Sequence, residues 1–343
     1  MIEIINIKNI NLRKNAILFS IVLMEIIVGS IFLFNFYQRE IVNKTSNKDK
    51  ITVIKKDNLI FPKNSEFRYY FELEPSVVVT SKPDWLGYEA NYNYNADGIN
   101  DRFDYTIEKP ADTFRIVALG DSFTYGQFVN TKDNWTEQLE DLLNKFNKSV
   151  SFSCGIKKFE IINLGMPGFD VSYITKRYQD IGAKYKPDLI IWFEGTSGFE
   201  RLNEIVMPTI EDCEKKEVNS SILAKDFYYC WKKANEKIKA EYSPAEVNKM
   251  ITDRLDSFFA SLNKEKVLFF TYEDSNLTSN SKKILNQWRE RYPSVVFSST
   301  IPGSARSQQI LSDGHPSVKG HETMAISIYN YLDNYLKGQC NVF

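Results

Sequence analysis

The strongest constraint in this chain of 343 residues is an alternation of short apolar runs with amphipathic segments, which starts at Thr113. Five runs have the length and composition of buried strands: FRIVALG, FEIINLG, PDLIIWFEG, VLFFTYE and SVVFSS. Segments with apolar residues at helical spacing separate them, beginning with NWTEQLEDLLNKF. Strands that alternate with helices in this way predict a parallel sheet covered on both faces. We therefore expect an α/β fold with about five central strands.

Periodicity and capping signals locate the helices between these strands. The clearest start is Ser243-Pro244-Ala245-Glu246, a capping box with proline at the first helical position. Residues 199–242 are interpreted as an insertion that contains a helix near 224–240. The other expected helices cover 134–146, 170–185, a segment that starts at 243, 279–292 and 317–337.

The apolar run at 16–37 stands apart from this pattern and is long enough to span a bilayer. Its single charged residue, Glu25, costs less than the many Ile, Leu, Val and Phe residues gain, so we expect an uncleaved transmembrane anchor. A cleaved signal peptide is the alternative, but the run ends in bulky Phe36 and Tyr37. Basic residues flank both ends, so charge does not set the orientation. We expect the domain that follows to lie outside the cytoplasm.

The rest of the chain divides around this anchor. Residues 1–15 form an N-terminal flank, and the Lys/Asn-rich residues 38–65 are interpreted as a tether. We expect one α/β domain at 66–343. Within it, 66–113 are a β-rich lead-in that precedes the core at 114–337.

Two motifs carry the groups that nucleophilic catalysis needs. The sequence Gly120-Asp121-Ser122-Phe123-Thr124-Tyr125-Gly126 directly follows the first core strand, at the edge where open parallel sheets bind ligands. The sequence Asp313-Gly314-His315-Pro316 precedes the last helix, and its proline suits a helix start. We expect Ser122 to be the nucleophile, His315 the base, and Asp313 the group that orients the imidazole.

Composition limits the other classes of function. The chain has only 2 histidines, so an imidazole base has two candidates and a multi-histidine metal centre is not expected. His321 falls in the last predicted helix and is interpreted as structural. No Walker loop, GxGxxG or CxxC motif indicates a cofactor. The net charge of −1 argues against a nucleic-acid partner.

These motifs together resemble those of the GDSL or SGNH hydrolases, in particular bacterial, membrane-anchored members. The resemblance covers about residues 114–337 and implies a three-layer, flavodoxin-like fold with a serine esterase site. It assigns the nucleophile to Ser122, and the acid and base to Asp313 and His315. A second block at 163–168, NLGMPG, matches the family segment whose Gly168 amide joins that of Ser122 in the oxyanion hole. The spacing Asp-x-His is one residue shorter than the usual Asp-x-x-His.

The third family block departs from the pattern. The family has Gly-x-Asn-Asp after the third strand, and here Ser197 falls on the asparagine position. That asparagine donates a hydrogen bond to the oxyanion, and losing such a donor costs about 2.7–4 kcal/mol. Ser197 has a shorter reach. Thr196, Asn203 and Arg201 are alternative donors, and an oxyanion hole with two backbone donors is the remaining interpretation.

The lead-in and the cysteines add weaker signals. Residues 91–98, NYNYNADG, resemble the lead-in of bacterial SGNH proteins from envelope-polysaccharide gene clusters. Tyr92 and Tyr94 there are either sugar-stacking residues or packing residues. Outside the cytoplasm up to two disulfides are allowed, with Cys213–Cys230 as the first pair, whereas four unpaired thiols are the alternative. The four cysteines are Cys154, Cys213, Cys230 and Cys340.

The sequence as a whole favours a membrane-anchored serine esterase that hydrolyses a small acyl ester. An O-acetyl group on an envelope polysaccharide is the substrate suggested by analogy. An O-acyltransferase with the same triad and a glycan acceptor is the second interpretation. A non-catalytic glycan-binding or assembly protein on a degenerate fold is the third, and the missing asparagine supports it. The sequence does not indicate an oligomeric state.

Overall fold

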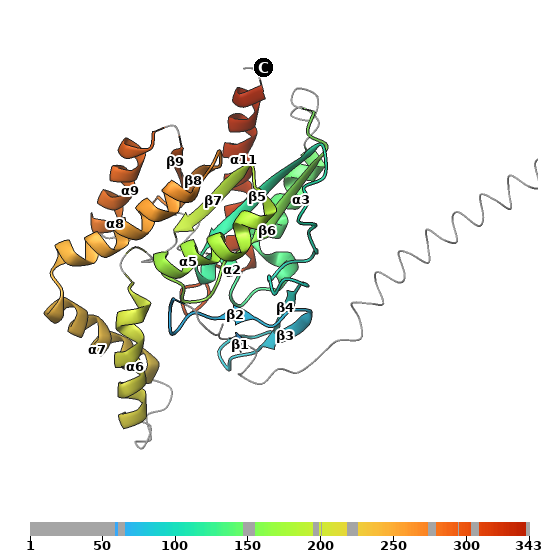
Figure 1. Ribbon diagram of the computed structural model, residues 1–343. Coiled ribbons are helices and arrows are strands. Elements are labelled where there is room, and N and C mark those ends of the chain that lie inside the picture. The colour runs from blue at the N-terminus through green and yellow to red at the C-terminus, as the bar shows by residue number, and fades with distance from the viewer. Residues whose placement is uncertain are drawn as a thin grey trace, which may run out of the picture. The chain divides into compact units, whose positions relative to one another are not determined.

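A parallel sheet of five strands forms the centre of the computed structural model (Figure 1). The order is β6-β5-β7-β8-β9, so the chain moves outward from β5 in one direction and then in the other. This reversal makes the carboxyl ends of β5 and β7 the expected ligand-binding edge. The predicted fold class and number of strands are confirmed. The strands are β5 (Thr113–Gly120), β6 (Lys158–Asn163), β7 (Leu189–Glu194), β8 (Lys266–Tyr272) and β9 (Val296–Ile301).

The structure describes residues 59–60, 66–146, 155–194, 199, 201–217, 226–273, 279–293, 295–302 and 309–340. The expected membrane segment at 16–37 lies outside these residues. Among the helices that are described, none is both long enough and apolar enough to cross a bilayer. Within the expected tether, strand β1 (Leu59–Ile60) pairs antiparallel with β2 (Glu72–Leu73) of the lead-in.

The helices match the predicted segments, with two differences. The expected helix at 170–185 is α-helical only as far as Arg177, and continues as a π-helical turn and a 3₁₀ turn to Tyr185. The described residues of the insertion contain two helices instead of one. The capping box at Ser243 and Glu246 is formed as predicted. Besides the single turn α2 (Ser122–Tyr125), the α-helices of the described residues are α3 (Trp135–Phe146), α5 (Val171–Arg177), α6 (Asn203–Glu217), α7 (Asp226–Glu241), α8 (Pro244–Ser261), α9 (Ser279–Arg291) and α11 (Val318–Cys340).

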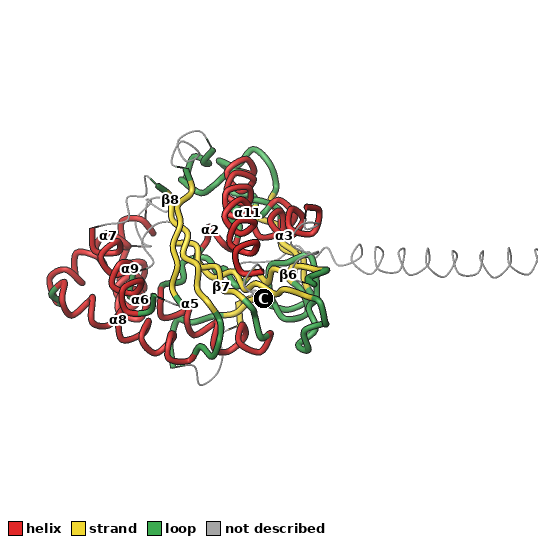
Figure 2. The backbone as a smooth tube through the Cα atoms, turned by 90° about the horizontal axis from the view of Figure 1, so that it is seen from above, coloured by secondary structure: helices red, strands yellow, loops and turns green. Residues whose placement is uncertain are grey.

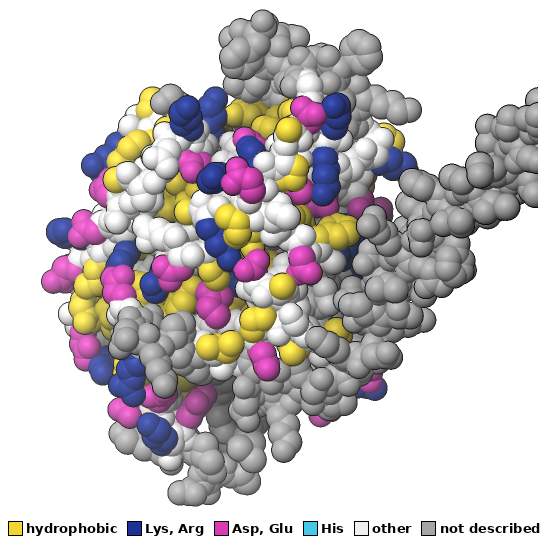
Figure 3. Space-filling model, turned by 45° about the vertical axis from the view of Figure 1, so that its right-hand side comes forward, with side chains coloured by type: hydrophobic (Ala, Val, Ile, Leu, Met, Phe, Trp, Pro, Cys, Tyr) yellow, Lys and Arg dark blue, Asp and Glu magenta, His cyan; other side chains and the backbone are white. Residues whose placement is uncertain are grey.

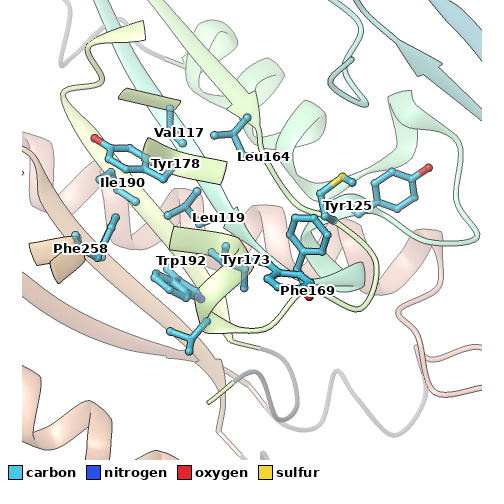
Figure 4. Close-up of a cluster of buried hydrophobic side chains, with 14 of the residues drawn as sticks. Val117, Leu119, Tyr125, Leu164, Phe169, Tyr173, Tyr178, Ile190, Trp192 and Phe258 are labelled. Carbon is cyan, nitrogen blue, oxygen red and sulfur yellow. The ribbon is translucent and has the colours of Figure 1, made fainter. Parts of the chain in front are cut away.

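Different helices cover the two faces of the sheet, which gives three layers (Figure 2). Consecutive side chains of a strand point to opposite faces. Ile116 and Ala118 of β5 therefore belong to a core shared with α3 and α11. Val117 and Leu119 belong to a core shared with α5, α8 and α9 (Figure 4). Both faces of β5 are thus buried, and its carboxyl end is fixed in position.

The insertion forms a helical hairpin that projects from the rest of the domain (Figure 1). Helices α6 and α7 share a small apolar core of their own. The Cys213–Cys230 disulfide joins them, which confirms the cysteine pair preferred from the sequence. Cys154 lies outside the described residues, and Cys340 is the last residue of α11.

The lead-in contributes a β-hairpin, β3 (Val77–Ser81) and β4 (Ala90–Tyr94). Tyr92 and Tyr94 on β4 are only 4% and 5% exposed, so neither presents a face to a sugar. The sugar-stacking interpretation is therefore wrong, because period-two alternation turns both rings inward. On the face shown in Figure 3, acidic and basic side chains are interspersed, without a large area of one sign.

Candidate active site

Ser122 occupies a sharp turn at the carboxyl end of β5. Gly120 allows this turn, because a Cβ there would lie 2.7 Å from the Phe193 carbonyl oxygen and 2.2 Å from the Thr124 hydroxyl. The Asp121 side chain then accepts the Phe123 N–H at 3.0 Å and caps the single helical turn α2 (Ser122–Tyr125). The result is a serine at the start of a helical turn, held at the edge of the sheet.

The structure brings Ser122, His315 and Asp313 together, although 193 positions separate the serine from the histidine. The Nε2 atom of His315 lies 2.9 Å from Ser122 Oγ. Its Nδ1 atom lies 2.7 Å from Asp313 Oδ2. These contacts form a continuous hydrogen-bonded chain from carboxylate to imidazole to hydroxyl. This is the arrangement in which a base removes the proton of a serine nucleophile.

The short Asp-x-His spacing fits this geometry. Gly314, between the two residues, has a φ of +93°, which glycine adopts without strain. This turn lets Asp313 accept the backbone N–H of His315 at 3.1 Å as well as contact its ring. The Leu311 N–H donates to the His315 carbonyl oxygen at 2.7 Å and closes the loop from the other side. The aspartate therefore reaches Nδ1 without the extra residue.

Two phenylalanine rings flank the imidazole of His315. Phe123 and Phe128 each lie 5.4 Å from it, measured between ring centroids. Phe128 has a φ of +68°, a conformation that costs energy for a bulky residue. Two lead-in tyrosines hold its backbone there: the Phe128 N–H donates to the Tyr92 hydroxyl at 2.7 Å, and the Tyr88 hydroxyl donates to the Phe128 carbonyl at 2.8 Å.

The second family block lies beside Ser122. Gly165 packs against the turn after the serine, where a Cβ would lie 2.2 Å from the Tyr125 nitrogen. The Met166 N–H donates to the Gly120 carbonyl at 3.2 Å, which ties this block to the end of β5. Gly168 has a φ of +73° and lines the same cavity as Ser122. The two proposed oxyanion amides thus belong to one connected loop pair.

The structure gives contacts for two of the side chains considered as a third oxyanion donor, Asn203 and Arg201. Ser197 and Thr196 lie outside the described residues. Asn203 directs its side-chain amide to the Gly168 carbonyl at 2.8 Å, and its backbone N–H to Asp170 at 2.6 Å. Asn203 therefore supports the Gly168 loop. The guanidinium of Arg201 lies over the ring of Trp231, 5.2 Å from its centroid.

A cavity of about 690 Å³ opens beside these groups, and Ser122, Asp313 and His315 all line it. The lead-in and the insertion supply much of its wall, which sequence reasoning did not foresee. Their side chains are separated by more than a hundred positions in the chain, and no local spacing connects them. These wall residues are Tyr69, Phe71, Arg201, Asn203, Met207 and Trp231.

A cluster of three buried carboxyl groups, Asp101, Glu137 and Glu140, lies next to Asn163, the first residue of the second block. The Tyr105 hydroxyl contacts Asp101 at 3.1 Å and Glu140 at 3.0 Å, and the Asn163 N–H donates to Asp101 at 3.4 Å. Burial raises the pKa of Glu140 to about 7. Burial and the neighbouring Glu137 and Glu140 carboxyls raise the pKa of Asp101 well above its usual range. The cluster holds the start of the second block.

The second histidine has no contact with the reacting groups. His321 is fully buried on α11, and its Nδ1 accepts the Trp135 N–H at 3.2 Å. Burial lowers the pKa of His321 to about 3, with a smaller contribution from His315. It is a neutral structural residue, as expected.

Comparisons with known proteins add a structural similarity. The sequence matches no family model and no curated protein. The crystal structure of TesA is 13% identical over 64% of this chain and 97% of its own, with a TM-score of 0.39. A two-domain esterase, CEX, described as active on acetylated mannans, is 15% identical over 66% of this chain and 50% of its own, with a TM-score of 0.41. A Clostridium thermocellum family 3 carbohydrate esterase is 12% identical over 66% of this chain and 99% of its own, with a TM-score of 0.39.

Proposed function

We propose that this protein is a serine esterase that hydrolyses a small acyl ester. The observation that carries the proposal is the hydrogen-bonded chain from Asp313 through His315 to Ser122, at the wall of a cavity. A degenerate binding protein has no need to keep all three groups within hydrogen-bond distance. The intact chain therefore favours an enzyme over the non-catalytic alternative.

The proposed reaction has two halves. Ser122 Oγ attacks the ester carbonyl while His315 Nε2 takes its proton, and Asp313 stabilises the imidazolium that forms. The negative oxygen of the tetrahedral intermediate is held by the amides of Ser122 and Gly168, with Ser197 as the proposed third donor. His315 then protonates the departing alcohol. Water, activated by the same imidazole, releases the acyl group from Ser122.

The proposed substrate is an O-acetyl ester on a glycan of the cell envelope. The wall of the cavity supports this choice, since it combines aromatic rings with polar side chains near the serine. A glycan hydroxyl in place of water makes the same triad an acyltransferase. Analysis of the products formed from an acetyl donor and a glycan acceptor separates the two reactions.

We further propose that residues 16–37 anchor the chain and that the domain lies outside the cytoplasm. The Cys213–Cys230 disulfide supports this, because such bonds persist in oxidising compartments and are rare in the cytosol. A membrane-impermeant protease added to intact cells will digest the domain if this placement is right. A domain protected until the membrane is broken contradicts it.

Hydrolysis of an aryl acetate by the detergent-solubilised full chain tests the esterase. Ser122→Ala should lower kcat by a factor of about 10³ or more, since the nucleophile is lost. Ser257→Ala is the matched control, because Ser257 is an exposed serine on α8. Equal rates for Ser122→Ala and the unchanged chain contradict the proposal.

A further inference from the structure

The cavity beside Ser122 is much larger than the acyl group that the proposed reaction transfers. An acetyl group contains two carbons, whereas a volume of about 690 Å³ lies in the range of sites for much larger ligands. Most of the cavity must therefore receive another part of the substrate. Its wall indicates which part.

Part of the cavity wall comes from two segments outside the catalytic motifs, namely the insertion hairpin and the lead-in. Met207 on α6 and Trp231 on α7 face the same cavity as Tyr69 and Phe71. Polar side chains are interleaved with these apolar groups, namely Gln127 after the nucleophile turn and Arg201 before α6. A long aliphatic acyl chain needs a continuous apolar wall. A sugar ring, with C–H faces and peripheral hydroxyls, matches the mixed wall.

The hairpin side of this wall is fixed by the contacts of the helices themselves. Trp231 follows Cys230 directly, and the disulfide of Cys230 with Cys213 holds α7 against α6. Trp231 and Met207 also pack against the small apolar core of the hairpin. A rigid base for an aromatic side chain is what a stacking surface requires, because ordering the ring on binding then costs little.

Two glutamates of α6 tie the lead-in side to the hairpin. Glu204 accepts the backbone N–H of Tyr69 at 3.1 Å and also the hydroxyl of Tyr173. Glu211 accepts the Tyr69 hydroxyl at 3.1 Å. The Tyr69 ring is thereby held by both its backbone and its hydroxyl.

We propose that the surface formed by Trp231, Met207, Tyr69 and Phe71 binds the sugar ring that carries the ester. This inference rests on the proposed esterase function and names the surface that binds the alcohol part of its substrate. The C–H face of the ring packs on the aromatic side chains. Gln127 and Arg201 meet its hydroxyls. The acyl group then points to Ser122 and the oxyanion amides.

The test compares Trp231→Ala with Tyr229→Ala in the full chain. Tyr229 is an aromatic residue on the same helix, but it is 44% exposed and does not line the cavity. Three substrates are used: ethyl acetate, ethyl octanoate and a fully O-acetylated methyl glucoside, of which only the last has a ring in its alcohol part. Trp231→Ala should lower kcat/KM for the glucoside about tenfold or more, mainly through KM, and change that for ethyl acetate less than about twofold. Trp231→Phe should restore most of the loss, and Tyr229→Ala should leave all three rates unchanged.

Other results overturn the inference. An equal loss on every substrate means that Trp231 only supports the fold, and thiol titration then shows whether the disulfide survives. A loss confined to the octanoate makes the wall an acyl-chain site. No loss on any substrate removes Trp231 from binding altogether. Failure of the esterase itself is a separate result, since it appears as aryl-acetate hydrolysis that is insensitive to Ser122→Ala.

Discussion

At the scale of single residues, the proposed base His315 is positioned by a neighbour that carries no catalytic group. The Phe128 ring lies against His315, and the Phe128 backbone has a positive φ that its side chain disfavours. Tyr92 and Tyr88 bond to the N–H and carbonyl of Phe128, one on each side. The lead-in thus fixes the imidazole through an intervening residue.

Tyr92→Phe removes the acceptor for the Phe128 N–H while keeping the ring. We expect kcat for the aryl acetate to fall about three- to tenfold with little change in KM, because the imidazole loses its fixed orientation. Tyr329→Phe is the control, since this tyrosine lies on α11 and does not line the cavity. If Tyr92→Phe lowers the melting temperature but leaves kcat and its pH profile unchanged, Tyr92 has only a packing role.

The position of a single side chain can be predicted from the sequence where one local motif determines it. Ser122 comes two positions after the end of β5, and Asp313 and His315 are two positions apart just before α11, so the local sequence indicates where each group lies. The Phe128 contacts could not be foreseen in this way. Tyr92 reaches Phe128 across 36 positions, and strand alternation shows only that the tyrosine points inward.

At the scale of elements, the insertion hairpin depends on its disulfide. Helices α6 and α7 have a core of only a few buried side chains, and 17 positions separate the two cysteines. In the chain-entropy account, closing a loop of this size stabilises the folded state by about 3 kcal/mol. The hairpin therefore lacks a large apolar core and relies on the covalent link.

Replacing both Cys213 and Cys230 by serine should destabilise the hairpin by about 2–4 kcal/mol. Since the central sheet has a large core on each of its faces, we expect limited proteolysis to cut within 203–241 while the rest of the domain resists. The unchanged chain after treatment with a reductant should behave in the same way. A cleavage pattern identical to that of the oxidised chain shows that the helices hold together without the bond.

At the scale of the whole molecule, two buried titratable groups oppose each other in their effect on stability. Glu140 has a folded pKa of about 7, above its ordinary 4.5, so its contribution is complete below 4.5 and is lost as the pH rises through 7. His321 has a folded pKa of about 3, below its ordinary 6.5, so its contribution is complete above 6.5 and is lost as the pH falls toward 3.

A substitution at either residue should weaken the pH dependence of the free energy of unfolding, toward alkaline pH for Glu140 and toward acidic pH for His321. Glu140→Gln still accepts the Ile161 N–H, so we expect the loss of stability between about pH 5 and about pH 8 to shrink by roughly 1–3 kcal/mol. His321→Asn keeps an acceptor for the Trp135 N–H and should reduce the loss between about pH 6 and about pH 4. Urea unfolding across this range measures both. Parallel curves for variant and parent contradict the assignment.

The whole-molecule architecture was largely predictable, because each strand contains a short apolar run that is shorter than a typical helix. The first helix of the hairpin, α6, was not predicted because it carries an internal proline, Pro208, and a weak apolar pattern. The wall of the cavity was missed for another reason. Tyr69 and Trp231 line one cavity although they come from the lead-in and the insertion, and no local sequence pattern connects the two segments.

The proposed mechanism requires that Ser122 is acylated during turnover. Rapid acid quenching of the full chain during aryl-acetate hydrolysis, followed by peptide mass spectrometry, detects this acyl-enzyme. We expect one added acetyl group on the peptide that contains Ser122, and none in Ser122→Ala. Turnover without any acetylated peptide, or with the acetyl group on another residue, would contradict it.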